Sequence, residues 1–212
     1  MIPASAFILI GGHSRRFGTP KWQAIIDGKT VLDHIWNACG KFQEIYTIGK
    51  QHRDNNKPFL RDELEIEAPI NGLYTALIHT NSDWILLLSC DLPLIDQDTI
   101  SHLWSSAKSG REIIVPEVNG ELQPTCAFYN RGLKDLVLEQ INNRRFSLKE
   151  LISKVDHHSI NMNEKSDYFL NMNTKDDYQK ARQILAKSSS TGTKYLSLIH
   201  ISEPTRRYAI SY

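Results

Sequence analysis

The chain has 212 residues, of which 41% are apolar and 23% charged, and its formal net charge is +1 at pH 7. This composition is typical of a soluble globular protein with one α/β domain. The near-zero net charge argues against bulk attraction to nucleic acid or to an anionic membrane. No stretch approaches the ~20 consecutive apolar residues of a membrane-spanning helix, and the N-terminus lacks the basic region of a signal peptide.

The three cysteines, Cys39, Cys90 and Cys126, lie far apart in the sequence. An odd number of cysteines without C-x-x-C spacing argues against a disulfide framework and against a zinc site. We therefore expect the protein in a reducing compartment, the cytoplasm.

The N-terminal stretch combines a short strand with a glycine-rich basic loop. Phe7–Ile10 is an apolar run that predicts a strand buried on both faces. Gly11 and Gly12 end this strand, residues 13–20 form a loop with two arginines, and Lys21 closes the loop. Bare backbone N–H groups followed by fixed cations suit a chain of phosphates. The run is neither a P-loop nor a G-x-G-x-x-G fingerprint, because two residues separate its last glycine from the lysine and its glycine spacing differs.

Strands and helices alternate along the rest of the chain, which predicts an α/β fold with a mostly parallel sheet flanked by helices. Further strands are expected at 44–48, 84–90, 113–115, 123–129 and 169–172, and one more is expected to end near residue 60. Apolar faces with helical spacing predict helices around 31–38, 70–78, 100–107, 133–141 and 174–185, and a capping box at Ser147 predicts a short one. Asn119-Gly120 predicts a hairpin, so the sheet should be mixed.

Trp84–Cys90 is the most apolar run and predicts a central strand, with Asp91 at its carboxyl end. Ligands of open α/β sheets bind outside the carboxyl ends of the strands. We therefore expect Asp91 and the glycine-rich loop to share one edge of the sheet. A strand-end aspartate can also serve only as a turn former. His157 and His158 fall in a predicted polar loop without metal-ligand spacing, and we expect them to be solvated.

The C-terminal part of the chain is expected to lie outside the domain, which should span residues 1–187. Residues 188–195 are rich in serine and threonine and are expected to form a flexible end. Residues 196–212 resemble the in-frame translation of a sequencing-library adapter. We expect them to be a non-native tail and leave them out of the fold prediction.

Five segments together resemble the nucleotidyltransferases related to molybdenum cofactor guanylyltransferase. They follow the family's order over residues 7 to about 187: the loop at 11–21, A-P-I-N-G-L at 68–73, C-D-L-P at 90–93, Q-P-T at 123–125 and F-L-N-M-N-T at 169–174. The resemblance implies a single Rossmann-like nucleotidyltransferase domain. The implied reaction transfers GMP from GTP to molybdopterin, with or without molybdenum, and releases pyrophosphate. Mg²⁺ is the implied cofactor.

The resemblance also implies roles for individual residues. Lys21 and Arg16 are expected to hold the triphosphate, and Asp91 to bind Mg²⁺. Asn171 and Asn173 are expected to alternate along a strand and to face the pterin. The remaining nucleotide contacts are expected at Leu9, Ile10, Gly11, Gly12, Asp62 and Gly72, with the Asp62 carboxylate accepting guanine N1–H and N2–H.

Two further implications of the resemblance concern a departure and the partners. Ile48 stands where the family often has an asparagine that touches the nucleotide, so that contact is expected to be lost or shifted. Besides the two substrates, transient contact with molybdenum-insertion proteins or molybdoenzyme chaperones is implied.

Three alternatives remain open at this point. A related cytidylyl- or sugar-phosphate nucleotidyltransferase would use the same loop, but Gly11-Gly12 favours the guanylyl branch because the cytidylyl relatives tend to have Ala-Gly there. A nucleotide-sugar glycosyltransferase usually places D-x-D on its metal, whereas this strand ends in D-L-P. A non-catalytic nucleotide-binding subunit is disfavoured by the intact Lys21 and Asp91.

Overall fold

A computed structural model describes residues 1–11, 20–51, 56–106 and 110–198, and for 188–198 it describes only the helical backbone. Within these residues, eight strands form one sheet in the order β10-β7-β9-β6-β1-β4-β5, with β8 paired to β7. The strands are β1 (Ser5–Leu9), β4 (Ile45–Gly49), β5 (Phe59–Arg61), β6 (Trp84–Ser89), β7 (Ile113–Val118), β8 (Glu121–Leu122), β9 (Cys126–Asn130) and β10 (His157–Asn161). A separate hairpin pairs β2 (Ile25–Ile26) with β3 (Lys29–Thr30).

The sheet is mixed and mostly parallel, as the sequence predicts. β6, β1, β4 and β5 are parallel neighbours, and β10 is parallel to β7. β9 is antiparallel to both β6 and β7, because the chain turns back after the hairpin at Asn119-Gly120. Both turn residues have positive φ, 51° and 78°, as a two-residue type I′ turn requires.

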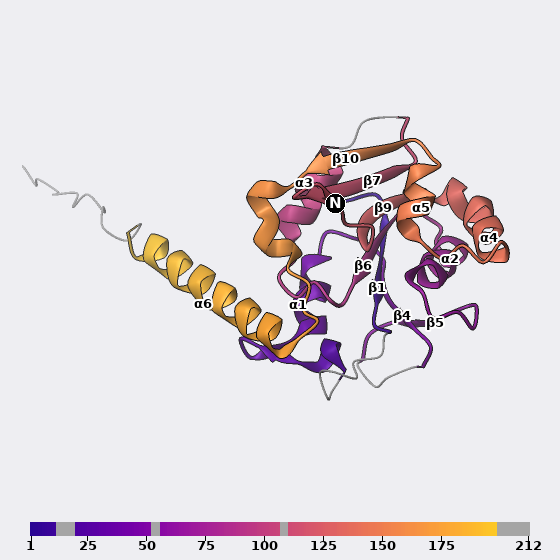
Figure 1. The fold of residues 1–212 in the computed structure, drawn as a ribbon. Helices are drawn as coiled ribbons and strands as arrows, with labels where there is room; N and C mark the ends of the chain where they lie inside the picture. Colours follow the sequence, from indigo (N-terminus) through magenta and orange to yellow (C-terminus); the bar gives the residue numbers. More distant parts are fainter. Residues whose placement is uncertain (12–19, 52–55, 107–109, 199–212) are drawn as a thin grey trace, which may run out of the picture.

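Helices cover both faces of the sheet (Figure 1). One face packs against α1 (Val31–Ala38), α3 (Gln97–Ser105) and the start of α6 (Lys175–Leu198); the other packs against α2 (Pro69–His79), α4 (Lys134–Asn142) and α5 (Leu148–Ser153). Side chains of the central strands point alternately into the hydrophobic cores on the two faces of the sheet. In β6, Leu86 and Leu88 pack on the α1 face and Ile85 and Leu87 on the α2 face, and all four are 0% exposed. A strand buried on both faces is therefore apolar at every position.

Local signals place the helix starts where they were predicted. The Thr30 hydroxyl accepts from the backbone N–H of Asp33 at 3.0 Å and begins α1. The Ser147 hydroxyl accepts from the N–H of Glu150 at 3.3 Å and begins α5. Each cap satisfies an N–H group that has no partner within the helix.

Two predictions about the C-terminal third are wrong. Residues 157–161 form the edge strand β10 instead of a polar loop, and there only Ile160 is buried. Residues 169–172 do not form a strand: Phe169 ends a 3₁₀ helix (Asn163–Phe169), and residues 170–173 are irregular. That segment lies beyond the end of β6, whose two edges are already paired with β1 and β9, so it cannot pair with β6.

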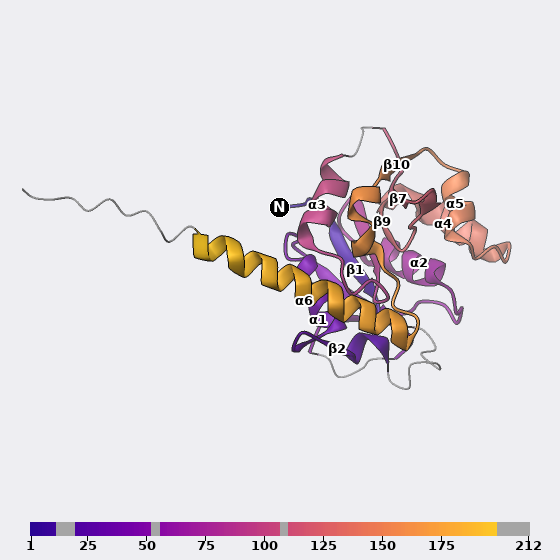
Figure 2. The same cartoon turned by 60° about the vertical axis from the view of Figure 1, so that its left-hand side comes forward.

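α6 begins beside the β2–β3 hairpin and extends away from the rest of the molecule in both views (Figures 1 and 2). It runs to Leu198, through the residues predicted to be a flexible end. The flexibility of residues 188–195 and the foreign origin of 196–212 stay predictions. In the described part of the chain, none of the helices has the length and hydrophobicity that crossing a bilayer requires.

Candidate functional site

The candidate site lies along one edge of the sheet, at the carboxyl ends of β5, β4, β1 and β6. These four strands are parallel, so the segments that follow them meet at the same edge. Backbone hydrogen bonds continue past the strand ends: Ile10 N–H donates to Ile48 O at 2.9 Å, and Asp62 N–H donates to Gly49 O at 2.9 Å. The residues at this edge are therefore held in register with the sheet.

Lys21 and Asp91 are in direct contact at this edge. The Lys21 ammonium lies 3.0 Å from Asp91 Oδ1 and donates to Asn173 Oδ1 at 2.7 Å. Lys21 begins a short 3₁₀ helix, Lys21–Gln23, that is anchored by the buried Trp22. The side chains of Lys21 and Asp91 are 14% and 35% exposed. A cation, a carboxylate and an amide thus meet in a partly solvated position, although the residues lie far apart in sequence.

A turn before α6 presents Asn173 to this pair. The backbone N–H of Met172 donates to Asp91 O at 2.8 Å, and the Met172 side chain is fully buried. The Asp177 carboxylate accepts from the N–H groups of Asn173 and Thr174, at 3.0 and 2.8 Å. These hydrogen bonds lower the pKa of the Asp177 carboxyl, with the Thr174 hydroxyl as the largest cause.

α6 is also tied to the hairpin that follows Lys21, because the Tyr178 hydroxyl donates to Ile25 O at 2.6 Å. Asp177 and Tyr178 are not among the residues that the sequence predicts for the site. The spacing Thr174-x-x-Asp177 is that of a capping box and could have revealed Asp177. The Tyr178 contact has no local signal, because its partner lies 153 residues away.

Asp62 lies at the far end of the same edge. It follows β5 directly, and its side chain is half-buried. Burial raises the pKa of the Asp62 carboxyl above its ordinary value; the nearby Lys50 opposes the shift and Glu65 adds to it. The Asp62 carboxylate is partly shielded from water, and its oxygens can still accept hydrogen bonds from a ligand.

The backbone that would border a nucleotide runs from Leu9 to Gly11. Gly11 is exposed, and a Cβ added to it would meet nothing within 4 Å. Gly72, in the second turn of α2, is buried beneath Leu9, and a Cβ there would lie 2.3 Å from Leu9 Cδ2. Ile48 is 1% exposed and belongs to the core beside these residues, so its side chain does not extend from the edge as a nucleotide contact would.

The structure therefore groups the predicted residues unevenly. Lys21, Asp91 and Asn173 are in contact, while Asp62 lies at the other end of the edge. The Asn171 side chain is exposed and has no hydrogen bond to any described residue, and it does not alternate with Asn173 along a strand. Gly12 and Arg16 lie outside the described residues.

Among the described residues, the buried cysteines near this edge are poorly suited to nucleophilic chemistry. Burial raises the pKa of the Cys90 thiol to about 12 and that of the Cys126 thiol to about 12, so neither is a ready nucleophile. Among the described residues, no three His, Cys, Asp or Glu side chains are close enough to hold a metal ion together. A metal ion at the described part of this edge would therefore need oxygen ligands from a bound molecule beside the Asp91 carboxylate.

Comparison with known proteins agrees with this geometry. Residues 6–158 match the family described as the MobA-like NTP transferase domain. A relative from Aquifex aeolicus (strain VF5), named "Probable molybdenum cofactor guanylyltransferase", is 31% identical over 170 residues, which cover 78% of this chain and 83% of the relative.

Two solved structures share the fold. The crystal structure of the Aquifex aeolicus VF5 protein Aq1419 has a TM-score of 0.68 and 30% identity, and the match covers 81% of this chain and 94% of that one. That of molybdopterin-guanine dinucleotide biosynthesis protein A from Archaeoglobus fulgidus has a TM-score of 0.75 at 20% identity, with 86% and 99% covered. The predicted family and fold class are confirmed. This chain belongs to the family of MobA-like NTP transferases and is a nucleotidyltransferase.

Proposed function

We propose that this protein transfers GMP from GTP to molybdopterin, forming the guanine dinucleotide form of the cofactor and pyrophosphate. The observation that carries the proposal is the contact of Lys21 with both Asp91 and Asn173 at the carboxyl ends of parallel strands. The relatives named for this reaction support the choice of base and acceptor.

The nucleotide lies along the edge of the sheet, with its base near Asp62 and its phosphates near Gly11, Lys21 and Asp91. β5 and β6 are separated by three strand spacings of about 4.8 Å, or roughly 14 Å. An extended nucleoside triphosphate can bridge such a span. The Asp62 carboxylate accepts N1–H and N2–H of guanine, a pair of donors that cytosine and adenine do not offer on one edge.

The chemistry needs positioning and charge neutralisation more than proton transfer. The attacking group is the terminal phosphate of the pterin, which is already an anion at neutral pH, so no general base is required. Lys21 and Arg16 neutralise the charge that spreads over the α-phosphate and the departing pyrophosphate. Asn173 keeps the Lys21 ammonium directed at this region through its 2.7 Å hydrogen bond.

Asp91 fits the requirements of a Mg²⁺ ligand. It is a partly exposed carboxylate without a cluster of further ligands among the described residues, and Mg²⁺ is commonly held by one or two carboxylates plus phosphate oxygens and water. The chemistry that Mg²⁺ supplies when bound is neutralisation of phosphate charge. The pterin lies on the side of Asn173 and Asn171, beyond the phosphates.

The direct test is mass analysis of the product that the full-length protein forms from GTP, molybdopterin and Mg²⁺. The expected product is the guanine dinucleotide, in an equal amount to pyrophosphate. Thermal stabilisation by GTP and by CTP, each with Mg²⁺, tests the base. A larger stabilisation by CTP, or a cytosine product, would show that the protein is a cytidylyltransferase and would refute this proposal.

A further inference from the structure

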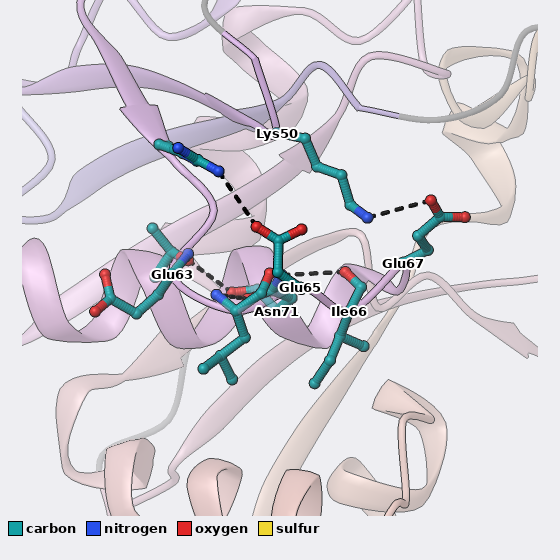
Figure 3. Close-up of polar contacts among 9 residues, drawn as sticks. Lys50, Glu63, Glu65, Ile66, Glu67 and Asn71 are labelled. Atoms are coloured by element: carbon teal, nitrogen blue, oxygen red, sulfur yellow. Dashed lines mark hydrogen bonds and ion pairs between the residues drawn. The ribbon is translucent and has the colours of Figure 1, made fainter.

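We propose that Asn71 is a positioning residue for base selection: its buried side chain shapes the loop that carries Asp62. The inference rests on the proposed function, because it assumes that Asp62 reads the guanine base. Asn71 lies in the first turn of α2 and is only 1% exposed. Figure 3 shows its amide directed at the backbone of the loop between β5 and α2.

Every polar atom of the Asn71 side chain is used by this loop. Asn71 Oδ1 accepts from the N–H of Leu64 at 3.1 Å. Its Nδ2 group donates to Leu64 O and, at 3.1 Å, to Ile66 O. A short loop has no strand or helix partners for these backbone groups, and the buried amide replaces them.

Thr75, one helical turn later, holds the same loop, and we call Asn71 and Thr75 together the clamp. Its hydroxyl accepts from the N–H of Glu63 at 2.9 Å and donates to Asn71 O at 2.9 Å. Thr75 is 0% exposed. Residues four apart lie on one face of a helix, so Asn71 and Thr75 together hold the loop from Glu63 to Ile66.

Asp62 is fixed between this clamp and the sheet. Its own N–H is bound to Gly49 O of β4 at 2.9 Å, and the next N–H, that of Glu63, is bound to Thr75. The backbone on both sides of the Asp62 side chain is therefore held by groups that do not belong to the loop. A preorganised acceptor discriminates between bases better than a mobile one, because it does not adapt to a wrong partner.

The charges around the loop support the same orientation of the nucleotide. Glu63, Glu65 and Glu67 are exposed beside Asp62; Lys50 pairs with Glu67 and Arg61 with Glu65 (Figure 3), and His79 Nε2 lies 3.8 Å from Glu63 Oε2. Among the described residues, the carboxylates here outnumber the lysine and the arginine that pair with them, and such an excess repels a triphosphate and favours the base at this end of the edge. Lys21 marks the opposite, phosphate end.

The test compares GTP with ITP, which lacks the 2-amino group of guanine, as substrates of full-length protein. For wild type and each variant, the ratio of kcat/KM for GTP to kcat/KM for ITP measures the Asp62 contact. Asp62→Asn sets the ratio expected when the contact is lost, a fall of roughly tenfold or more, as for a hydrogen bond to a charged group. Asn71→Ala is expected to lose most of the same preference while kcat at saturating GTP stays within about threefold.

Leu77→Ala is the matched control. Leu77 lies on the same helix and is 0% exposed in the hydrophobic core, but its side chain has no polar atom that could hydrogen-bond to the loop. Truncation of a buried leucine leaves a cavity and destabilises a protein, so this variant reports what a loosened helix alone does. It is expected to keep the wild-type GTP to ITP ratio.

A second pair of variants tests the clamp without removing Asn71. Thr75→Val keeps the shape and removes the hydroxyl, whereas Thr75→Ser keeps the hydroxyl. Amide exchange at Glu63 is expected to speed up at least about tenfold in Thr75→Val and to stay near wild type in Thr75→Ser. The GTP to ITP ratio is expected to fall only in Thr75→Val.

The outcomes separate this inference from the proposed function. Selectivity retained in Asn71→Ala and Thr75→Val, but lost in Asp62→Asn, would overturn the role of Asn71 and leave the proposed function standing. Equal loss in Leu77→Ala would also overturn it, because loosening of the helix would then suffice. A wild type that makes no guanine dinucleotide from GTP would refute the proposed function, and the inference with it.

Discussion

Replacing Lys21 by glutamine removes a charge from the centre of the candidate site and keeps an N–H donor on a side chain that is one atom shorter. In wild type, the Lys21 ammonium is held by Asp91 and Asn173, at 3.0 and 2.7 Å, and its side chain is only 14% exposed. A cation fixed in this way does not need to reorganise as charge develops on the phosphates. Loss of one such preorganised group typically costs about 10²–10³ in rate. We expect Lys21→Gln to lower kcat by that factor.

The same structure predicts a small effect on stability. The Asp91 side chain is 35% exposed, and ion pairs of this kind contribute at most about 1 kcal/mol. For a domain of this size, that corresponds to a fall in Tm of roughly 2–4 °C. The variant should therefore be folded and inactive, which separates loss of chemistry from loss of fold.

The assay is pyrophosphate release from GTP with molybdopterin and Mg²⁺, measured with thermal unfolding of the same samples. Lys41→Gln is the control, because Lys41 is a partly buried lysine that donates to Ser101 at 3.0 Å. Lys41 O accepts from Ile2 N–H, which places this lysine at the opposite end of the sheet. Activity of Lys21→Gln within about threefold of wild type would refute the reasoning. A fall in Tm well beyond that of the control would instead assign the loss to the fold.

Three further predictions follow from the same contacts. Burial raises the pKa of the Asp62 carboxyl, so its charged form lowers the stability of the folded state when the pH is above the folded pKa. This penalty disappears as the pH falls below the ordinary pKa of 3.8. Asp62→Asn should therefore raise Tm at pH 7 and leave it unchanged near pH 3, and equal gains at both pH values would contradict this. Gly72→Ala places a Cβ 2.3 Å from Leu9 Cδ2, the end of a flexible side chain that must move; Tm should fall slightly and the KM for GTP should rise, whereas an unchanged KM would separate Gly72 from the site. Asp177→Ala removes the acceptor that holds the Asn173 N–H at 3.0 Å and should raise the KM for molybdopterin several-fold, with recovery in Asp177→Asn; a change in the KM for GTP alone would contradict that placement.

The helices and most strands could be predicted because their patterns are local. Trp84–Ser89 is apolar at every position, and a strand covered on both faces must be so. Thr30 and Ser147 mark helix starts through hydrogen bonds that span only three residues. Such signals depend on residues that are close in sequence, so they can be recognised without knowledge of the fold.

The two errors arise where the environment overrides the pattern. β10 contains two histidines, a serine and an asparagine and has little strand character, but it is an edge strand paired only with β7, so few of its side chains need to be apolar. Residues 170–173 alternate in hydrophobicity as a strand does. The N–H of Met172 nevertheless donates to Asp91 O, because the edges of β6 are occupied by β1 and β9.

The candidate site divides in the same way. The position of Lys21 after a glycine-rich loop, and of Asp91 after the most apolar strand, can be read along the chain, since polar residues at the carboxyl ends of parallel strands meet at one edge. Which of these side chains touch one another cannot be read in this manner. Lys21 meets Asp91 across 70 residues and Asn173 across 152, and Asn71 closes on a loop whose shape exists only once α2 is packed. Periodicity encodes which face of an element is buried, whereas contacts between distant side chains depend on the order and register of strands that the folded chain alone establishes.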